Sequence, residues 1–418
     1  MAPDVEPKSA PRLFDLKLVR AKLTCGFRSR HARFHLSSSN PADGTDERSS
    51  LIHQEILKLV ALIAVAAAAF FVTRAIAANN RDMSLRDAAE WYERGQRQLD
   101  AGDAGAAIDS FRRATVKHRD EKRYVLALAR ALASTRQYDT ARSALLTLRE
   151  SAPEDPDINL QLARLAADRQ DVTEAINYYH HALYAPWPTD QTDARRRVRV
   201  ELIRFLLTHD QANRALSELV ALSTDLPDEA AAHAEVGQLF ASAGDSGHAL
   251  DQFQKALRLA PDSGAALAGA GQAAFQGGDY LLARKYLANA PEDGDRVKET
   301  RELVELVLSD DPLAARIGSS ARRRRLEDNF AYAEQRLNTC VAQRPGGQPS
   351  PDALALGDEA QAFKDQLTPS IILEEDTIES GVELIYRIER EVVQNCPPPT
   401  PLDRALMIIG QHHGVDQR

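Results

Sequence analysis

Residues 88–114 read AAEWYERGQRQLDAGDAGAAIDSFRRA and contain the pattern that decides the fold. An aromatic residue is followed four positions later by a glycine, and a Gly-Asp turn then separates two amphipathic stretches. The second stretch places an alanine, a large aromatic and another alanine on one helical face. This spacing predicts two short antiparallel helices joined by a tight turn. The residues that define the pattern are Trp91, Gly95, Gly102, Asp103, Ala107, Phe111 and Ala114.

The same pattern returns along the chain with a period of 34 residues. The first alanine of the second helix recurs at spacings of 34, 34, 40, 34 and 34, and the longer interval holds a six-residue insertion near residues 188–193. A large apolar residue follows each alanine by four positions, and a small residue precedes it by twelve, with Ile203 as the exception. One hairpin cannot bury its apolar face alone, so the period predicts a stack of hairpins. The alanines are Ala107, Ala141, Ala175, Ala215, Ala249 and Ala283.

This arrangement resembles the tetratricopeptide repeat (TPR). The resemblance implies an all-α fold, an α-α superhelical solenoid in which one helical hairpin forms each repeat. Pro153, Pro227 and Pro261 stand where three of the units close, because a helix must stop there. The predicted units are residues 88–121, 122–155, 156–189, 196–229, 230–263 and 264–290.

Residues 291–418 do not continue the repeat. We expect them to form a helical C-terminal cap over the last repeat, and a separate small domain is the alternative. Helices are predicted at residues 296–309, 312–341, 351–367 and 371–394, with a stiff Pro-rich break at residues 397–401.

The most apolar segment of the chain lies before the repeats. Residues 59–72 contain no charge or amide, and the extended segment of residues 56–76 would be about 31 Å long as a helix, enough to cross a hydrocarbon core. Lys58 and Arg74 flank it and can reach the headgroups. We therefore predict one N-terminal transmembrane helix at residues 56–76. Two alternatives are a buried soluble helix and a signal peptide cleaved after Ala77.

Charge predicts how such a helix is oriented. The first 50 residues carry nine Lys or Arg and six Asp or Glu, whereas residues 79–418 carry a net charge of about −13. By the positive-inside rule, the basic and mostly disordered tail of residues 1–50 stays in the cytoplasm. Its stretch at residues 13–23 could also rest on anionic lipid. The predicted location is thus the inner membrane, single-pass, with the repeats in the periplasm; repeats facing the cytoplasm are the alternative.

The sequence contains no recognisable catalytic or cofactor motif. There is no phosphate-binding loop, dinucleotide fingerprint, HExxH or CxxC pattern, so we expect no cofactor, no metal and no enzyme activity. His180-His181 and His412-His413 lack partners at metal-ligand spacing and are predicted to be surface residues. A net charge of −9 argues against nucleic acid as a partner. If the body is exported, Cys340 and Cys396 are a candidate disulfide, with two unpaired thiols as the alternative, while Cys25 stays reduced.

In TPR arrays the first helix of each unit lines a concave face, where partner peptides commonly lie. The resemblance therefore implies a peptide-binding groove to which positions 2, 5, 9, 12 and 13 of each unit contribute. Arginines at equivalent positions of successive units would form a ladder suited to carboxylates. The alternative is that these arginines pair with acids such as Asp157 and Asp168, or are solvated. Position 9 holds Gln96, Arg130, Arg164, Arg204, Gln238 and Gln272, and position 2 adds Arg123 and Arg197.

These observations predict an interaction scaffold. A membrane-tethered TPR protein that binds an extended acidic or C-terminal peptide is the leading hypothesis, and the resemblance implies a role in bacterial envelope assembly or secretion. An Ala- and Arg-rich, Lys-poor composition is typical of a bacterium of high GC content. The partners would be other proteins or peptides and, through residues 56–76, the membrane; no small-molecule substrate is evident. An enzyme whose C-terminal region carries catalysis is the second hypothesis.

Overall fold

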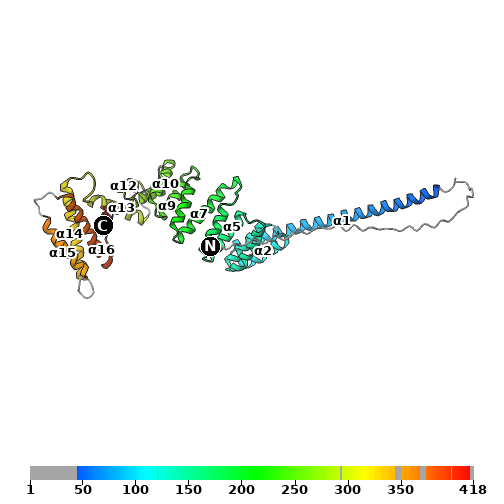
Figure 1. Ribbon diagram of the computed structural model, residues 1–418, viewed down its shortest axis with the longest axis horizontal. Helices are drawn as coiled ribbons and strands as arrows, with labels where there is room; N and C mark the ends of the chain where they lie inside the picture. Colours follow the sequence, from blue (N-terminus) through cyan, green and yellow to red (C-terminus); the bar gives the residue numbers. More distant parts are fainter. Residues whose placement is uncertain are drawn as a thin grey trace, which may run out of the picture. The chain divides into compact units, whose positions relative to one another are not determined.

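The computed structural model describes residues 45–119, 121–291, 294–343, 350–367, 373–396 and 398–414. Within these ranges the chain forms 17 α-helices and one short 3-10 helix, and no strand (Figure 1). The all-α prediction is therefore confirmed. The chain divides into two units, residues 1–81 and 82–418. Most of the predicted basic tail, including residues 13–23, lies outside the described residues.

Helix α1, Thr45–Asp100, contains the apolar segment. From Glu55 onward it is long and apolar enough to cross a membrane, and no part of its most apolar window is buried against protein. Leu62 and Phe71 are 70% and 67% exposed, which in water would be costly for such large side chains. The helix begins at Thr45, so residues 45–50, which were predicted to be mostly disordered, are helical.

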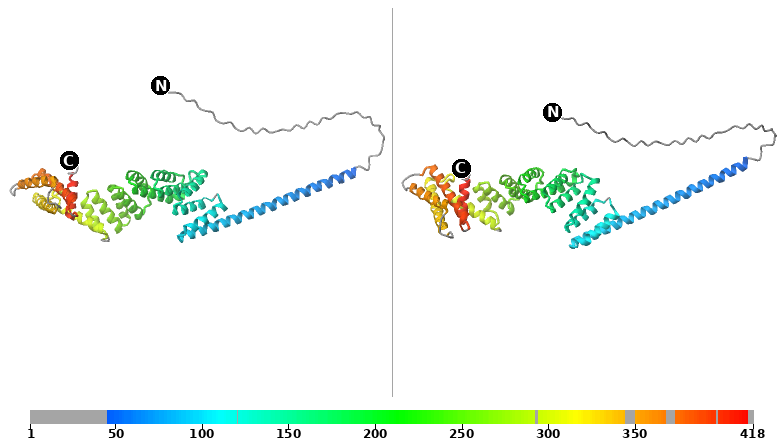
Figure 2. Two further views of the ribbon diagram at one scale, coloured as in Figure 1. Left: turned by 90° about the horizontal axis from the view of Figure 1, so that it is seen from below. Right: turned by 60° about the horizontal axis from the view of Figure 1, so that its bottom comes forward.

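From Asp82 onward the helices pair as hairpins that follow one another in chain order (Figure 2). In each pair the first helix is termed helix A and the second helix B. The end of α1 pairs with α2 (Ala104–Lys117). The other pairs are α3 (Lys122–Ser134) with α4 (Tyr138–Ser151), α5 (Pro156–Asp168) with α6 (Val172–Leu183), α7 (Thr192–Thr208) with α8 (Ala212–Ser223), α9 (Ala230–Ser242) with α10 (Ser246–Leu259), and α11 (Gly264–Gln276) with α12 (Tyr280–Leu287).

The insertion between the third and fourth hairpins lengthens a helix. A 3-10 helix, Thr189–Gln191, leads directly into α7, which begins four residues before the predicted unit boundary at residue 196. The extra residues are thus absorbed by one added turn, and the spacing of the later hairpins returns to 34.

Every hairpin turns through one residue in the left-handed backbone conformation. This residue is a glycine in three hairpins, with φ of 79–84°, and a residue with a side chain in the other three, with φ of 57–63°. The next residue is the N-cap of helix B, and in four hairpins it is an aspartate that accepts a hydrogen bond of 2.9–3.0 Å from the backbone N–H three residues on. Gln137 and Gln211 stand at this position without a side-chain cap. The left-handed residues are Gly102, Arg136, Gln170, Asp210, Gly244 and Gly278.

The hairpins pack by placing small residues of helix A against large residues of helix B. A Cβ atom added to Gly95 would lie 2.6 Å from the Phe111 ring of the same hairpin. Phe253 is approached from two sides, because a Cβ at Gly237 would lie 3.1 Å from it and one at Gly269 of the next hairpin 2.4 Å. The periodic small and large residues therefore set how closely neighbouring helices approach.

Five further helices follow the hairpins. They are α13 (Asp295–Asp310), α14 (Ser319–Gln343), α15 (Pro351–Gln366), α16 (Glu375–Asn395) and α17 (Pro401–His412). The helix expected from residue 312 begins only at Ser319, because Arg316 has a φ of 67° and Gly318 precedes the helix. Helix α17 was not predicted. It starts directly after the Pro-rich break, where Thr400 and Asp403 cap it reciprocally.

Helix α17 lies against α13 and α16, next to the sixth hairpin. The His412 ring packs edge-on against Tyr280, with centroids 5.2 Å apart. The His413 Nε2 atom lies 3.0 and 3.1 Å from the two carboxylate oxygens of Asp311. His412 is exposed, as predicted, and His413 is half-buried. Both side chains also connect α17 to the preceding helices, which was not predicted.

A buried polar cluster joins α14, α16 and α17. Asp403 is fully buried and accepts hydrogen bonds of 2.6 Å from both the Tyr332 hydroxyl and the Arg336 guanidinium. Burial alone would raise the pKa of Asp403, but these hydrogen bonds and those from Thr400 hold it below its ordinary value. Glu389 is also fully buried, and its carboxyl oxygens have no hydrogen-bond partner among the described residues. Burial, together with the nearby Asp403 charge, raises the pKa of Glu389 to about 8.

Candidate peptide-binding groove

The first helices of the hairpins form one surface, here called the helix-A face, and its polar residues follow a register. Counted from the start of each predicted unit, the side chain at position 9 faces position 6 of the following unit. Two junctions show this by direct bonds, Arg164 with Glu201 and Arg204 with Glu235. Gln272 of the last unit bonds in a similar way to Thr300 of α13, which lies outside the predicted units. The register lets each junction be compared with the next.

The junction between the third and fourth hairpins is fully paired. The Arg164 guanidinium donates two hydrogen bonds of 2.7 Å to the two carboxylate oxygens of Glu201, and the Tyr179 hydroxyl donates a third of 2.9 Å. Burial alone would raise the pKa of Glu201, but these donors hold it below its ordinary value. Burial beside this carboxylate raises the pKa of Tyr179. The charge of Arg164 is therefore neutralised by a neighbour rather than left for a ligand.

The next junctions are paired or uncharged. Arg204 donates a hydrogen bond of 2.6 Å to Glu235. Gln272 accepts one of 2.9 Å from Thr300. Gln238 is exposed and is opposite Gly269 in the register, and Gln96 at the start of the array is half-buried and opposite Ala127. Glutamates 201 and 235 were not predicted as partners, although their place at position 6 of the following unit was a usable signal.

The junction between the second and third hairpins differs from the others. Position 6 of the third unit is Gln161, an amide, so Arg130 has no acid opposite it. Arg130 forms no ion pair with any described residue; its Nε donates only a long bond of 3.5 Å to the Leu126 carbonyl. Arg130, Gln161, Arg164 and Asp168 line a pocket of about 220 Å³. Desolvation at the pocket wall raises the pKa of Asp168.

The two position-2 arginines are not equivalent. Arg123 lies over the rings of Tyr92 and Tyr124, at 5.5 and 5.2 Å, and 3.4 Å from the Glu121 carboxylate. Its guanidinium is thus held against aromatic faces. Arg197 is exposed and forms no ion pair with the described residues. The predicted ladder of arginines is therefore not uniform, because some of its charges are paired and others are exposed.

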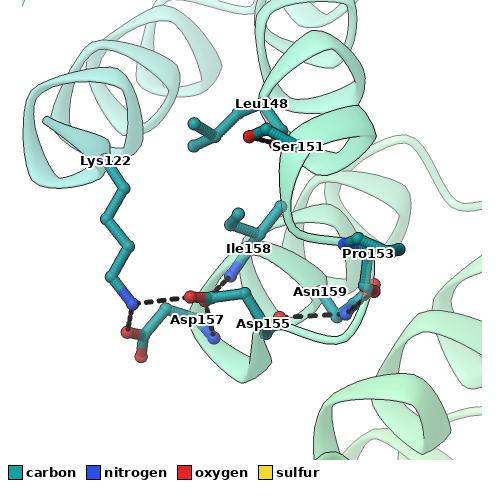
Figure 3. A network of polar contacts seen from close by, with 8 residues as sticks. All are labelled: Lys122, Leu148, Ser151, Pro153, Asp155, Asp157, Ile158 and Asn159. Atoms are coloured by element: carbon teal, nitrogen blue, oxygen red, sulfur yellow. Dashed lines mark hydrogen bonds and ion pairs between the residues drawn. The ribbon is translucent and has the colours of Figure 1, made fainter. Parts of the chain in front are cut away.

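The acids that the sequence suggested as partners for these arginines are used differently. Asp157 pairs with Lys122, whose Nζ lies 2.8 Å from Asp157 and 2.8 Å from Asp155 (Figure 3). Asp155 also caps α5, and the buried Asn159 side chain donates to the carbonyls of Pro153 and Asp155. This network connects the start of α3 to the turn before α5. No described arginine forms an ion pair with Asp168.

The remaining candidate residues fall outside the helix-A face. The structure joins Cys340 of α14 to Cys396 after α16 as a disulfide, with Cα atoms 5.6 Å apart, while Cys25 lies outside the described residues. His180 lies 3.6 Å from Glu218, and the His181 ring packs near Tyr178. Across the described part of the chain, no group of three or more His, Cys, Asp or Glu is placed to hold a metal ion.

Comparisons with known proteins identify the repeats. The tetratricopeptide repeat family model matches residues 92–146, 126–190, 209–263 and 237–295. No curated protein matches the chain. Residues 92–190 and 209–295 are thus tetratricopeptide repeats, as the 34-residue period predicted.

Several solved structures are similar to part of this chain. The type IV pilus biogenesis factor PilW is 16% identical, with a TM-score of 0.37 over 50% of this chain and 96% of PilW. The C-terminal part of a TPR protein from Cytophaga hutchinsonii is 14% identical, with a TM-score of 0.38 over 69% and 98%. YrrB, described as a TPR protein with an unusual peptide-binding site, is 18% identical, with a TM-score of 0.31 over 47% and 95%. The family match by itself defines a scaffold for protein–protein interaction.

Proposed function

We propose that this protein is a membrane-anchored scaffold of the bacterial envelope that captures an extended acidic or C-terminal peptide segment on its helix-A face. The observation that carries the proposal is the exposed Arg130, opposite the amide of Gln161 beside a pocket, in a register where Arg164 and Arg204 are already paired. A guanidinium can donate two parallel hydrogen bonds to a carboxylate, so Arg130 is the position-9 arginine that is suited to bind an incoming acidic group.

The surroundings of Arg130 support a peptide rather than a small molecule. The pocket is open and small, enough for one side chain, and it lies in a face that continues along successive hairpins. Asp168 opposes an incoming anion from the same pocket wall. Because the pKa of Asp168 is raised, protonation weakens this repulsion only where the pH approaches that pKa. At neutral pH the positive charge of Arg130 therefore has to outweigh the negative charge of Asp168.

Capture can be measured with defined peptides and the full chain in lipid nanodiscs. The probe is a fluorescein-labelled ten-residue peptide with three glutamates, compared with its glutamine version. We expect Arg130→Gln to weaken binding of the glutamate probe by about fivefold, the size of one exposed charge-assisted pair. The matched control is Arg214→Gln, because Arg214 is an exposed arginine on a second helix, α8, away from the helix-A face.

Two further comparisons refine the result. A free against an amidated C-terminus on the probe separates terminal-carboxylate recognition from acidic side chains. Asp168→Asn should tighten glutamate-probe binding, because it removes the opposing charge from the pocket. Equal affinity of wild type and Arg130→Gln for the glutamate probe would refute peptide capture at this junction.

The proposed anchor is the exposed apolar part of α1, and the proposed orientation places the repeats in the periplasm. The pairing of Cys340 and Cys396 supports this orientation, because structural disulfides persist in oxidising compartments. The test uses spheroplasts and membrane-impermeant reagents. Labelling of Cys340 and Cys396 by an impermeant maleimide should require prior reduction with an impermeant phosphine but no permeabilisation. Labelling only after permeabilisation would place the repeats in the cytoplasm.

A further inference from the structure

A second hollow lies on the opposite side of the first two hairpins, where the second helices rather than the first are exposed. Helices α2 and α4 form its walls and α3 its floor. It encloses about 740 Å³ and is lined mostly by apolar atoms. Val125 and Leu128 of α3 lie at the bottom, and Val116 of α2 is 65% exposed at its edge. This hollow is called the α2–α4 cleft below.

The lining of the cleft has one charge. Its polar residues are hydroxyl side chains of α2 and α4, and the single charged residue is Arg119, just after α2. Arg119 is exposed and forms no ion pair with the described residues. The hollow one repeat further along, between α4 and α6, is lined differently, because it contains Glu154, Asn177 and His180. The apolar lining of the first junction is therefore not repeated at the next one.

The geometry points to a helix as the occupant. Thr140, Ala144, Thr147 and Ser151 recur three or four residues apart on α4, and they form a stripe about 16 Å long, or three helical turns. Both walls are helices whose backbone groups are bonded internally, so the cleft offers no partners to the backbone of a bound strand. A bound helix satisfies its own backbone and needs only to bury an apolar face.

We propose that the α2–α4 cleft is a docking site for an amphipathic helix of another protein, about three turns long, whose apolar face enters the cleft and whose acidic residue pairs with Arg119. The charge is argued from complementarity, since the lining holds one cation and no anion. The small hydroxyl side chains on α4 allow the two helices to approach closely. The protein would then hold two partners at once, an extended segment on one face and a helix on the other.

The probe for this site is a synthetic 16-residue helix with leucines at positions 1, 4, 5, 8, 11 and 12 and one glutamate beside this stripe near one end. Binding is measured by fluorescence anisotropy with the full chain in nanodiscs, and empty nanodiscs correct for adsorption to lipid. A peptide of the same composition with scrambled leucine spacing is the reference. We expect the helical probe to bind the wild type. The scrambled peptide should bind at least about tenfold more weakly.

Two valines provide a matched pair of variants. Val116→Asp places a charge at the cleft edge, and Val220→Asp places the same charge on α8, where Val220 is 47% exposed and lines none of these hollows. Both sites are exposed and lie near the end of a second helix, so both variants should fold, which circular dichroism verifies. Val116→Asp should weaken probe binding about tenfold, because the carboxylate must be desolvated, and Val220→Asp should not change it.

A charge exchange tests the role of Arg119. Arg119→Glu should weaken binding of the glutamate probe and restore binding of a version with lysine at that position. Equal binding of the helical and scrambled probes, or equal loss in the two valine variants, would overturn the proposal. Sedimentation without the probe tests whether a second copy of this chain occupies the cleft instead. If the wild type self-associates without binding the probe and Val116→Asp abolishes this association, the proposal is overturned as well. Arg130→Gln should leave the helical probe unaffected, so this test is independent of peptide capture on the helix-A face.

Discussion

The six hairpins and the five C-terminal helices are held together in different ways. In the hairpins the same small-to-large contact and the same left-handed turn recur every 34 residues, so each hairpin depends mainly on its neighbours. In the C-terminal helices a few unrepeated contacts join distant residues: Cys340 with Cys396, Tyr332 with Asp403, and Arg404 with Glu299. A substitution in the hairpins should therefore have a local and moderate effect, whereas one in the C-terminal helices should affect several helices together.

The largest effect is expected from the Cys340–Cys396 disulfide. It closes a loop of 56 residues, and its loss should cost about 4 kcal/mol by loop-closure entropy. Cys340→Ser with Cys396→Ser should raise hydrogen–deuterium exchange in α14, α16 and α17 together, with little change in α3 to α10. Cys25→Ser is the control. Exchange that stays at wild-type rates in the double variant would show that the C-terminal helices do not depend on this bond.

Glu389 should make the C-terminal helices sensitive to pH. Its pKa is raised from 4.5 to about 8 in the folded protein, so the folded state holds a proton that the unfolded state releases, and stability falls as pH rises between these values. The loss at pH 7 is about 3 kcal/mol by linkage. Glu389→Gln, neutral at every pH, should slow hydrogen exchange in α16 and α17 at pH 7, and this gain should fade towards pH 4.5. Glu383→Gln on the same helix should show no such trend; parallel behaviour of the two variants would contradict the assignment.

A packing change in the hairpins should cost less and remain local. Gly269→Ala would place a methyl group 2.4 Å from the Phe253 ring, and such overpacking typically costs about 1–3 kcal/mol. Faster hydrogen exchange is expected in α10 and α11, with α3 and α4 unchanged. Gly105→Ala is the matched control, because its nearest contact would be 3.7 Å away and alanine favours a helix. A uniform rise in exchange across all hairpins would contradict the nearest-neighbour view.

The smallest effect is expected at the turns. Arg136 adopts a φ of 60° where the equivalent residues Gly102 and Gly244 carry no side chain. Arg136→Gly should therefore stabilise the second hairpin by about 0.5–1 kcal/mol, and Gly244→Arg should destabilise the fifth by a similar amount. The two variants should shift the thermal midpoint by circular dichroism in opposite directions. A shift in the same direction would mean that the turn conformation does not limit stability.

The sequence predicted the candidate site only in part. The 34-residue register identified Arg130, Arg164 and Arg204 as equivalent positions, and the structure places the bonded members of this set in one repeated geometry. The register did not indicate which arginine is neutralised by an acid. That depends on the residue that faces the arginine across a junction, 31–37 positions later in the chain. The α2–α4 cleft was not predicted, since its lining comes from three helices whose exposed faces carry unremarkable residues.

Local periodicity determined the hairpin array and its turns, because each contact in a repeat recurs at a fixed distance along the chain and so leaves a visible pattern. The apolar segment was equally apparent, since length and composition alone decide whether a helix can cross a membrane. The pairing of Arg164 with Glu201, the burial of Glu389 beside Asp403, and the docking of α17 were decided only by the tertiary structure. These contacts occur once between residues far apart in the chain, and the burial that governs their charges exists only when the helices are packed.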